Sequence, residues 1–485
     1  MNEVIYFGHN KNPKLFKNES YKITKPIQFK FENENENENE KQIKQIASGY
    51  FGTIFLFKNG EAIEYSKYTN QNPEKIQIEN IQKVTVGGDN EAILTKEGNV
   101  FTRGEDINYK NPKEFINISS LIEDPNDRII QDIVSGLDSV YLLTSNQNVY
   151  GIGSNVSGQL GLGSRRIQSA EKPILIMKNV SRIFSGHYSL HAFLLNSNQE
   201  LFGCGLNRYG QLGLGESRKE ETEIMQLTQI QNIPKGKIID IQMGEYHSVM
   251  LIENENENPK RKLYSCGNHR NNGLGKDENT YEFTEIKSSL FENDDNILDF
   301  SVGSYHTLIL TEKVKMFGFG FNDLCQLGVE DIEDPPIPIQ IELPKLRFNE
   351  EISNYHISCG FGKTFLYYSP FLSSFSNLEE DLIKLFRRKE FCNISFKTEN
   401  GEIIKAHKLI LKYRLNQNEN QIEKLQEIIS KKSIKESNQI FEMIYSNRII
   451  NPILYSEIKE IINSNEKIEE TMKRIYLNEN ENEIL

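Results

Sequence analysis

Short apolar runs recur along the chain as far as Tyr368, each preceded by a glycine and followed by a polar turn. The runs are rich in β-branched and aromatic residues and span only four or five positions, which is typical of buried strands rather than helices. They are TIFLF from Thr53, AILT from Ala92, VYLLT from Val140, HAFLL from His191, SVMLI from Ser248, TLILT from Thr307 and TFLYY from Thr364. The preceding glycines are Gly49, Gly87, Gly136, Gly186, Gly244, Gly303 and Gly360. Their spacing of 38 to 59 residues predicts seven structural repeats.

A second strand, such as VFTRG, VYGIG or LFGCG, is predicted after each polar turn, so that each repeat contains a β-hairpin. The most similar copies are VYGIGSNVSGQLGLG at 149–163 and LFGCGLNRYGQLGLG at 201–215, with weaker copies at 263–275 and 316–328. Glycines inside the second strand suit places where backbones crowd near a common axis. These glycines are Gly153, Gly205, Gly267 and Gly320. Because each repeat has room for four strands, the predicted fold class is an all-β seven-bladed propeller.

The two ends of this region complement each other. The seventh repeat has its first hairpin strand but lacks the glycine-containing return strand, whereas the opening segment VIYFGHN, residues 4–10, matches VYGIGSN and has no partner before it. We therefore expect the N-terminal strand to complete the last blade and close the ring. The alternative is a six-bladed ring with loose ends.

On these residues the first 368 positions resemble the repeats of the regulator of chromosome condensation family, which implies a seven-bladed propeller. The phrase GxNxxGQLG carries the resemblance in two repeats. The family commonly has a tryptophan before the second glycine, but this chain contains none and places Ile152, Cys204, Cys266 and Phe319 there. The first two repeats also depart from the family pattern. Where the glycines are expected, the first has Glu64, Tyr65 and Ser66, and the second has Thr102 and Arg103. Blades one and two are therefore expected to be the least regular.

A second domain is predicted after a linker at 369–377. Residues 378–485 begin with helical spacing, continue with a strand pair around Glu399-Asn400-Gly401, and become helical again. This order, with the motif Ala406-His407-Lys408, resembles the opening of a BTB (POZ) domain, a small α/β fold in which these residues are structural. A short polar segment at 416–421 replaces the usual middle part, so the domain is predicted to be abbreviated. A propeller followed by such a domain is similar to the inhibitor of Bruton tyrosine kinase group.

The formal charge of −13 disfavours nucleic acids and acidic membranes as partners, since both require a positive surface. No apolar run approaches the roughly 18 residues of a membrane-spanning helix, and MNEVIYFGHN does not resemble a signal peptide. We expect a cytoplasmic protein, with a nuclear location as the alternative because of Arg387-Arg388-Lys389. The five scattered cysteines are expected to be reduced thiols in apolar surroundings. The ENEN tracts at 32–40 and 253–258 predict surface loops.

His247 and His306 share one repeat position, at which three other repeats place Ser139, Ser189 and Lys363. Equivalent positions on separate blades do not form a compact ligand set, so we expect these histidines to bond the strand backbone. The glycine-rich segments lack the spacing of a phosphate-binding loop. We therefore predict no catalytic residue, no cofactor and no metal, and hence no enzyme.

The predicted function is a non-enzymatic scaffold that binds protein partners through the propeller loops and the BTB-like domain. The family resemblance extends this to a substrate adaptor of a cullin-type ubiquitin ligase, with cullin as the partner. The abbreviated middle of the domain weakens both cullin binding and homodimerisation. The alternative is guanine-nucleotide exchange on a small GTPase.

Overall fold

The computed structural model describes most of the region predicted as a propeller and short parts of the C-terminal region. The described residues are 4–9, 22–29, 42–50, 52–69, 73–105, 107, 111–254, 256–257, 259–287, 295–330, 332–344, 354–369, 394–406, 425–433, 436–438 and 440–441. The chain divides into two compact units, Met1–Ser373 and Ser374–Leu485. No helix in the described ranges is long and apolar enough to span a membrane.

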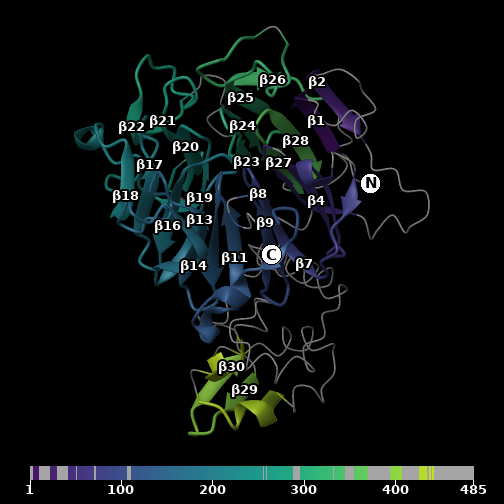
Figure 1. Ribbon diagram of the computed structural model, residues 1–485, viewed down its shortest axis with the longest axis vertical. Helices are drawn as coiled ribbons and strands as arrows, with labels where there is room; N and C mark the ends of the chain where they lie inside the picture. The colour runs from purple at the N-terminus through teal and green to yellow at the C-terminus, as the bar shows by residue number, and fades with distance from the viewer. Residues whose placement is uncertain are drawn as a thin grey trace, which may run out of the picture. The chain divides into compact units, whose positions relative to one another are not determined.

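Seven antiparallel four-stranded sheets make up the first unit, as Figure 1 shows, and the propeller prediction is confirmed. Blade 1 contains β3 (Ile43–Ser48), β4 (Gly52–Phe57), β5 (Ala62–Ser66) and β6 (Glu74–Lys75). Blade 2 contains β7 (Ile81–Val86), β8 (Asn90–Thr95), β9 (Val100–Gly104) and β10 (Ile116–Asn117). Blade 3 contains β11 (Ile130–Ser135), β12 (Ser139–Thr144), β13 (Val149–Ser154) and β14 (Ser169–Met177).

The remaining blades repeat this order of strands. Blade 4 contains β15 (Val180–Phe184), β16 (His191–Asn196), β17 (Leu201–Leu206) and β18 (Glu223–Gln229). Blade 5 contains β19 (Lys237–Met243), β20 (His247–Glu253), β21 (Arg261–Gly267) and β22 (Thr280–Glu285). Blade 6 contains β23 (Ile297–Val302), β24 (His306–Thr311), β25 (Met316–Gly320) and β26 (Ile339–Ile341). Blade 7 combines β27 (Tyr355–Cys359) and β28 (Lys363–Tyr368) with β1 (Val4–His9) and β2 (Lys22–Phe29).

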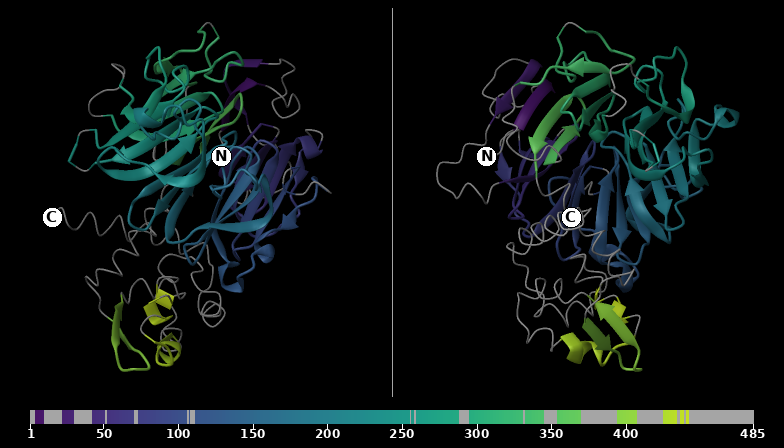
Figure 2. Two further views of the ribbon diagram at one scale, coloured as in Figure 1. Left: turned by 60° about the vertical axis from the view of Figure 1, so that its left-hand side comes forward. Right: turned by 180° about the vertical axis from the view of Figure 1, so that it is seen from behind.

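The N-terminal strand closes the ring, as expected from the sequence. β1 pairs antiparallel with β28, with Val4 opposite Tyr367 and Gly8 opposite Lys363. The purple strands β1 and β2 accordingly lie beside the green β28 in Figures 1 and 2. The first strands of successive blades contact one another in cyclic order, including β27 of blade 7 with β3 of blade 1.

The apolar core lies between blades. Each of the seven junctions has its own cluster of buried side chains drawn from the two sheets that meet there. Because the second strand of a blade is covered on both faces, every residue of β4, β8, β12 and β16 is buried. This explains why the second strands appear in the sequence as continuous apolar runs rather than as alternating ones.

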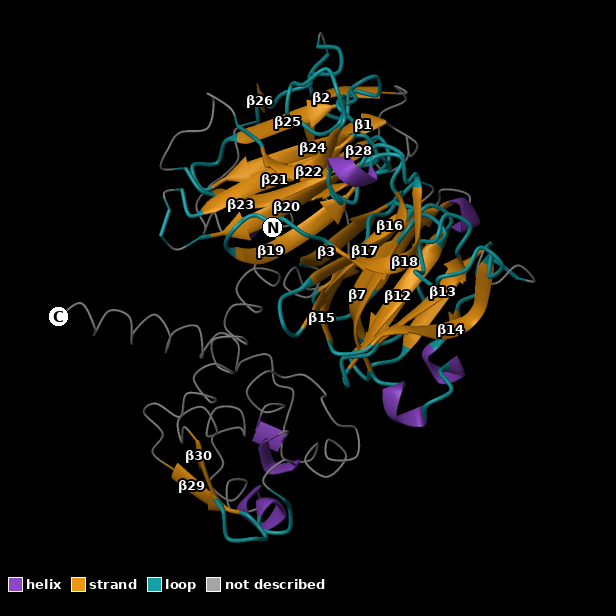
Figure 3. Cartoon of the chain, turned by 90° about the vertical axis from the view of Figure 1, so that its left-hand side faces the viewer, coloured by secondary structure: helices purple, strands orange, loops and turns teal. Residues whose placement is uncertain are grey.

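Helical structure in the described part of the propeller is limited to short 3₁₀ turns, and strands dominate Figure 3. The turns are η1 (Lys67–Thr69), η2 (Ser119–Leu121), η3 (Pro125–Asp127) and η4 (Glu216–Arg218). The first two blades differ from most others in having outer strands of only two residues, β6 and β10. Their three inner strands are regular, so the irregularity expected there is confined to the periphery.

In the second unit, β29 (Ile394–Lys397) and β30 (Ile403–Ala406) form the predicted hairpin. Gly401 has a positive φ of 81° in its turn, a conformation that glycine adopts without strain. Phe396 packs against Phe441 with ring centroids 5.0 Å apart. The predicted linker at 369–377 lies outside the described residues except for Ser369, and the domain boundaries remain predictions.

Candidate functional site

The glycines that end the first strands lie where neighbouring blades touch. A Cβ atom on Gly186 would sit 1.8 Å from the carbonyl oxygen of Met243 in the next blade. On Gly303 it would sit 2.7 Å from the carbonyl oxygen of Gly360 in the next blade and 2.1 Å from Cε1 of His306 in its own blade. Close approaches also occur at Gly136, Gly244 and Gly360, where a Cβ would come within 2.9 Å of a neighbouring atom. These glycines allow the inner strands to close around the axis.

Glycine is required in the third strands for a different reason. Gly153 has φ of 102°, and a Cβ there would sit 2.3 Å from the carbonyl oxygen of Asp138 in its own blade. Positive φ and a similar clash recur at Gly205, Gly267 and Gly320. Both sets of predicted glycines therefore shape the blades.

The phrase GxNxxGQLG forms a repeated hydrogen-bonded turn after the third strand. The Asn155 side chain accepts from the Leu160 backbone N–H at 3.0 Å, and the Gln159 side chain accepts from the Ser157 N–H at 2.9 Å. The same two bonds occur in blades 4 and 6, through Asn207 and Gln211 and through Asn322 and Gln326. The asparagine and glutamine are buried, so the phrase specifies a turn rather than a ligand site.

The histidines link successive blades around the axis. Nε2 of His191 lies 2.8 Å from Oγ of Ser248, and Nε2 of His247 lies 3.0 Å from Oγ1 of Thr307. Nε2 of His306 lies 3.3 Å from Oγ1 of Thr364. Because the Ser248 hydroxyl donates its hydrogen to a backbone carbonyl at 2.7 Å, we assign the hydrogen of this contact to Nε2 of His191. We call these three interactions the histidine belt.

Burial keeps the histidine belt neutral. It lowers the pKa of each of its histidines from 6.5 to about 3, and for His191 and His306 neighbouring histidines add to the effect. Nδ1 of His247 and of His306 has no hydrogen-bond partner among the described residues, which agrees with an unprotonated nitrogen. The prediction of a structural role placed their bonds on the backbone, but the partners are hydroxyls of the next blade.

One alignment from the sequence is wrong in detail. Counting three residues from the glycine placed Ser189 at the histidine position of blade 4, but the strand pairing places His191 there, opposite Gly205. The loop of this blade is two residues longer, which the spacing alone does not reveal. Lys363 does occupy the position in blade 7, and its Nζ lies 3.4 Å from Oγ1 of Thr53.

Charged side chains of the first strands form a second set of bonds between blades. The Lys83 ammonium lies 2.6 Å from the Asp132 carboxylate, and the Arg182 guanidinium lies 3.4 Å from Asp240. Each first strand has a local register shift in its pairing with the second strand, and each of these four residues is the first to pair after that shift. Sequence reasoning missed these pairs because the register shift is visible only in the sheet.

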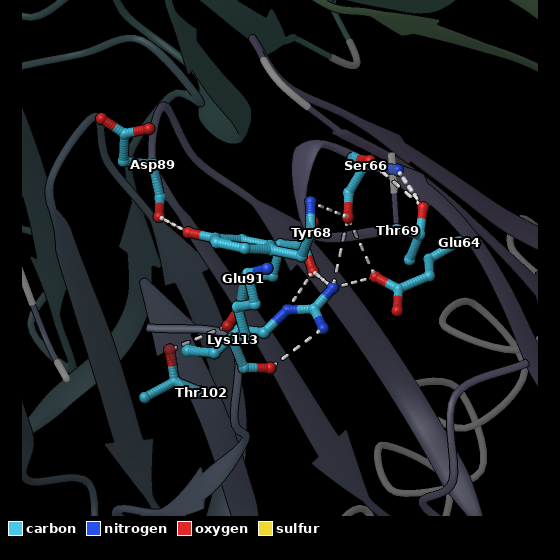
Figure 4. A network of polar contacts seen from close by, with 9 residues as sticks. Glu64, Ser66, Tyr68, Thr69, Asp89, Glu91, Thr102 and Lys113 are labelled. Atoms are coloured by element: carbon cyan, nitrogen blue, oxygen red, sulfur yellow. Dashed lines mark hydrogen bonds and ion pairs between the residues drawn. The ribbon is translucent and has the colours of Figure 1, made fainter. Parts of the chain in front are cut away.

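An ionic cluster joins blades 1 and 2 (Figure 4), and two of its members, Glu64 and Arg103, stand where blade 3 has Gly151 and Ile152. The Arg103 guanidinium donates to the Glu91 carboxylate from Nε at 2.9 Å and from Nη2 at 2.6 Å, and also to Glu64. The guanidinium carbon lies 4.6 Å from the Tyr68 ring centroid and 4.4 Å from that of Phe115. All three charged side chains are buried.

Two carboxylates share one guanidinium in this cluster, so it is short of one positive charge. Burial, followed by the charge of Glu91, raises the pKa of Glu64 from 4.5 to about 7, although Arg103 opposes the shift. The degenerate repeats noted in the sequence have thus exchanged glycine and apolar contacts for a buried ionic contact between blades.

Seven half-buried aromatic side chains gather at one end of the propeller, and we call them the aromatic face. They lie on the first loops, which join the first and second strands, and on the loops that follow the third strands. Because adjacent strands are antiparallel, both kinds of loop lie at the same end of a blade. The aromatic face consists of Tyr50, Tyr188, Tyr209, Tyr246, Tyr305, Phe321 and Phe361.

These rings are in mutual contact although they come from five blades. The centroid of Phe361 lies 4.5 Å from that of Tyr50, 5.5 Å from Tyr188 and 5.9 Å from Tyr305. Tyr305 lies 5.9 Å from Tyr246. Further contacts extend the cluster to Tyr209 and Phe321. A signal was present in the sequence, since an aromatic residue follows the repeat glycine within two positions in five repeats.

Carboxylates accompany the aromatic face. The hydroxyl of Tyr305 donates to Glu245, which lies in the first loop of blade 5. Asp89, in the first loop of blade 2, lies 2.5 Å from the Lys67 ammonium. Burial, and then the charges of nearby acidic groups that include Glu245 and Asp89, raise the pKa of Tyr188. This end of the propeller therefore combines aromatic rings with negative charge.

No group of three or more histidine, cysteine or acidic side chains within the described ranges could hold a metal ion. Cys204, Cys266, Cys325 and Cys359 are buried free thiols, as expected, whereas Cys392 lies outside the described residues. Of the BTB-like motif, Ala406 is buried at the end of β30. His407 and Lys408 lie outside the described residues, so their predicted role stays a prediction.

Comparison with known proteins supports the repeat assignment. Residues 198–251 match the model of the regulator of chromosome condensation (RCC1) repeat. The chain is 25% identical over 235 residues to the ultraviolet-B receptor UVR8 of Arabidopsis thaliana, covering 48% of this chain and 50% of that protein. It is 24% identical over 229 residues to the guanine nucleotide exchange factor SRM1 of Saccharomyces cerevisiae, covering 44% and 46%. The matches thus span half or less of these relatives' length.

Solved structures share the fold. The crystal structure of Prp20p from Saccharomyces cerevisiae matches this chain with a TM-score of 0.61 and 18% identity. That protein was described together with its binding properties to Gsp1p and histones. The match covers 76% of this chain and 91% of that one. The same yeast protein has also been crystallised bound to Kap60.

Proposed function

Since the chain is a seven-bladed propeller of regulator of chromosome condensation repeats, we propose that it is a non-enzymatic scaffold that binds a protein partner at the aromatic face. The observation that carries this proposal is a contiguous group of half-buried rings contributed by loops of five blades. Aromatic residues are enriched at the energetic centres of protein interfaces because they bury much area at little entropic cost. A ring of loops on a rigid scaffold also suits recognition.

A site-specific cross-link tests this proposal. A photoreactive phenylalanine analogue at Tyr246 should form a discrete adduct with a cellular protein. The same analogue at Ile174, an exposed residue of the outer strand β14, serves as the control and should not form that adduct. Absence of any adduct from Tyr246, Tyr188 and Phe361 would argue against the aromatic face as a binding site.

We extend the proposal to the second unit, as a BTB-like module that recruits a cullin and makes the protein a substrate adaptor. Its support is the β29–β30 hairpin ending at Ala406, in the order that the sequence motif leads one to expect. Affinity purification of the full chain should recover a cullin, and deletion of 370–485 should abolish the recovery. Recovery of cullin by the propeller alone would contradict the assignment. A cytoplasmic location forms part of the same proposal, and a fluorescent fusion tests it.

The second candidate function is guanine-nucleotide exchange, and the likeness to the exchange factor SRM1 favours it. A nucleotide-release assay over a panel of small GTPases separates the two functions. The scaffold proposal predicts no acceleration at catalytic concentrations of the protein. Acceleration that is lost on replacing Tyr246 with alanine would instead assign exchange to the aromatic face.

A further inference from the structure

The carboxylate of Glu245 is enclosed by the aromatic face without a compensating cation. Tyr305 donates a hydroxyl hydrogen bond to it. Burial, and then the neighbouring Glu245 carboxylate, raise the pKa of Tyr246. The backbone of Glu245 is fixed by its N–H, which donates to the Ser304 carbonyl at 2.9 Å. The residue is half-buried and forms no ion pair within the part of the chain that the structure describes.

Two basic groups near this end of the propeller, Lys67 and Arg103, are held by acidic partners. Lys67 lies 2.5 Å from Asp89 and 3.0 Å from Glu105. Arg103 is held by Glu64 and Glu91 in the cluster between blades 1 and 2. Neither cation is left to neutralise Glu245.

A second acidic group of the first loops is in the same situation. Asp138, in blade 3, accepts from the Gln159 side-chain amide at 3.0 Å and forms no ion pair within the described ranges. Two carboxylates of the first loops, Glu245 and Asp138, thus lack a cationic partner among the described residues. The chain as a whole carries a formal charge of −13, which adds to the attraction of a positive partner.

Aromatic rings and a carboxylate favour the same kind of ligand. The faces of tyrosine and phenylalanine rings attract cations, and a half-buried carboxylate gains most from a partner of opposite charge. An anionic ligand would meet repulsion from Glu245. A metal ion would lack ligands, since no group of three suitable side chains exists among the described residues.

We propose that the aromatic face binds its partner through a lysine or arginine side chain, which lies against Tyr246 and Tyr305 and pairs with Glu245. This inference rests on the proposed function of the aromatic face as a protein-binding surface, and it names the chemistry of the partner. The occupant is a positively charged segment of another protein.

Calorimetric titration of the full chain with paired peptides tests the inference. One short glycine- and serine-rich peptide carries arginines, and its partner carries citrulline, which has nearly the same shape without the charge. The arginine peptide should bind at least about tenfold more tightly, because a desolvated ion pair and a cation–π contact together supply a difference of this order. Equal binding of the two peptides would overturn the inference.

Matched variants locate the effect. Glu245→Gln should weaken arginine-peptide binding at least about fivefold, as expected for loss of a charge-assisted contact. Glu282→Gln removes the same charge from an exposed position of the outer strand β22 and should have no effect. Tyr246→Phe keeps the ring and should retain most of the binding, whereas Tyr246→Leu should lose it. An equal effect of Glu245→Gln and Glu282→Gln would show nonspecific attraction and overturn the inference.

The outcomes separate this inference from the proposed function. If the photo-cross-link from Tyr246 forms but the arginine and citrulline peptides bind alike, the scaffold stands and the cationic partner is wrong. If no cross-link forms from the aromatic face, the proposed function itself fails. Self-association in sedimentation that Tyr246→Leu abolishes would identify a second copy of this chain as the occupant and would also overturn the inference.

Discussion

At the scale of single residues, the repeat glycines and the charged residues of the ionic cluster obey different physical constraints. Gly186 has no space for a Cβ because the next blade's backbone occupies that volume. Glu64 and Arg103 occupy positions of the same kind of third strand, but in neighbouring blades, and each makes the other tolerable by supplying the opposite charge. Substitutions at the two kinds of position should therefore change stability for different reasons. At Gly186 the reason is steric overlap with the next blade, and at Glu64 it is the protonation of a buried carboxylate.

Gly186→Ala should destabilise the propeller by at least about 2 kcal/mol, because the new methyl group overlaps the Met243 carbonyl and the inner strands must move apart. Gly163→Ala is the control, since a Cβ there meets nothing within 4 Å and only its positive φ of 73° opposes the change, by about 1 kcal/mol. Denaturant unfolding measures both. Equal losses at the two positions would refute the overlap argument.

Glu64→Gln should stabilise the protein more at pH 8 than at pH 5. The folded chain keeps a proton on Glu64 up to about pH 7, whereas the unfolded chain loses it near 4.5, so the stability that Glu64 contributes falls as pH rises between these values. Glutamine removes this loss, which is on the order of 1–3 kcal/mol. Melting temperatures of wild type and variant at both pH values test it.

Glu282→Gln, at an exposed carboxylate, is the control for this pH series. A difference between Glu64→Gln and wild type that does not change with pH would contradict the buried-cluster argument.

At the scale of elements, the blades are joined by side-chain bonds that run in one direction around the axis. Each histidine of the belt reaches the hydroxyl in the second strand of the next blade, and Lys363 makes the equivalent contact from blade 7 to blade 1. The repeated hairpin therefore supplies both the imidazole and the hydroxyl that receives the preceding one. Neutral imidazoles are required, since a buried charge without a partner would be costly.

His247→Asn should lower stability at pH 7 but also reduce its loss on acidification. Between about pH 6.5 and 3 the unfolded chain binds a proton at each belt histidine that the folded chain does not, so the stability from each one falls as pH is lowered. Removing one histidine should reduce the slope by about 1.4 kcal/mol per pH unit. Denaturant unfolding at pH 7, 6 and 5 gives the slope.

Thr307→Val is the matched control, because it removes the hydroxyl that contacts His247 without removing the titrating group. It should lower stability while leaving the slope nearly unchanged. Parallel slopes for wild type and His247→Asn would exclude a buried neutral imidazole.

At the scale of the whole molecule, closure depends on a strand that is separated from its partner by nearly the full length of the propeller. All six residues of β1 are buried. Tyr6 packs against Phe365 at 4.9 Å between ring centroids and belongs to the cluster between blades 7 and 1. Phe7 belongs to the cluster between blades 6 and 7. The strand thus contributes to both junctions of the last blade.

Deletion of residues 1–10 should lower the melting temperature by at least about 5 °C, because it exposes two apolar junctions and leaves β28 without its partner. Lys25→Ala, an exposed substitution in the adjacent strand β2, should leave the melting temperature within about 1 °C of wild type. An unchanged melt after the deletion would mean that β1 does not contribute to closure.

The repeat pattern alone determined the strands, the number of blades and the completion of the last blade by the N-terminal strand. Apolar runs and glycines determine the conformation of only a few neighbouring residues. Such local features can therefore be recognised in the sequence without knowledge of the fold. The hairpin around Gly401 was predictable for the same reason.

Contacts between blades were decided only by the tertiary structure. Glu64 meets Arg103 across 39 residues, and His191 takes the belt position only because a longer loop shifts its strand. Rings of the aromatic face share a surface because closure of the ring brings five loops together. The repeat period shows which positions of the blades are equivalent. Which side chains of neighbouring blades are in contact depends on the orientation of each blade and on the length of each loop.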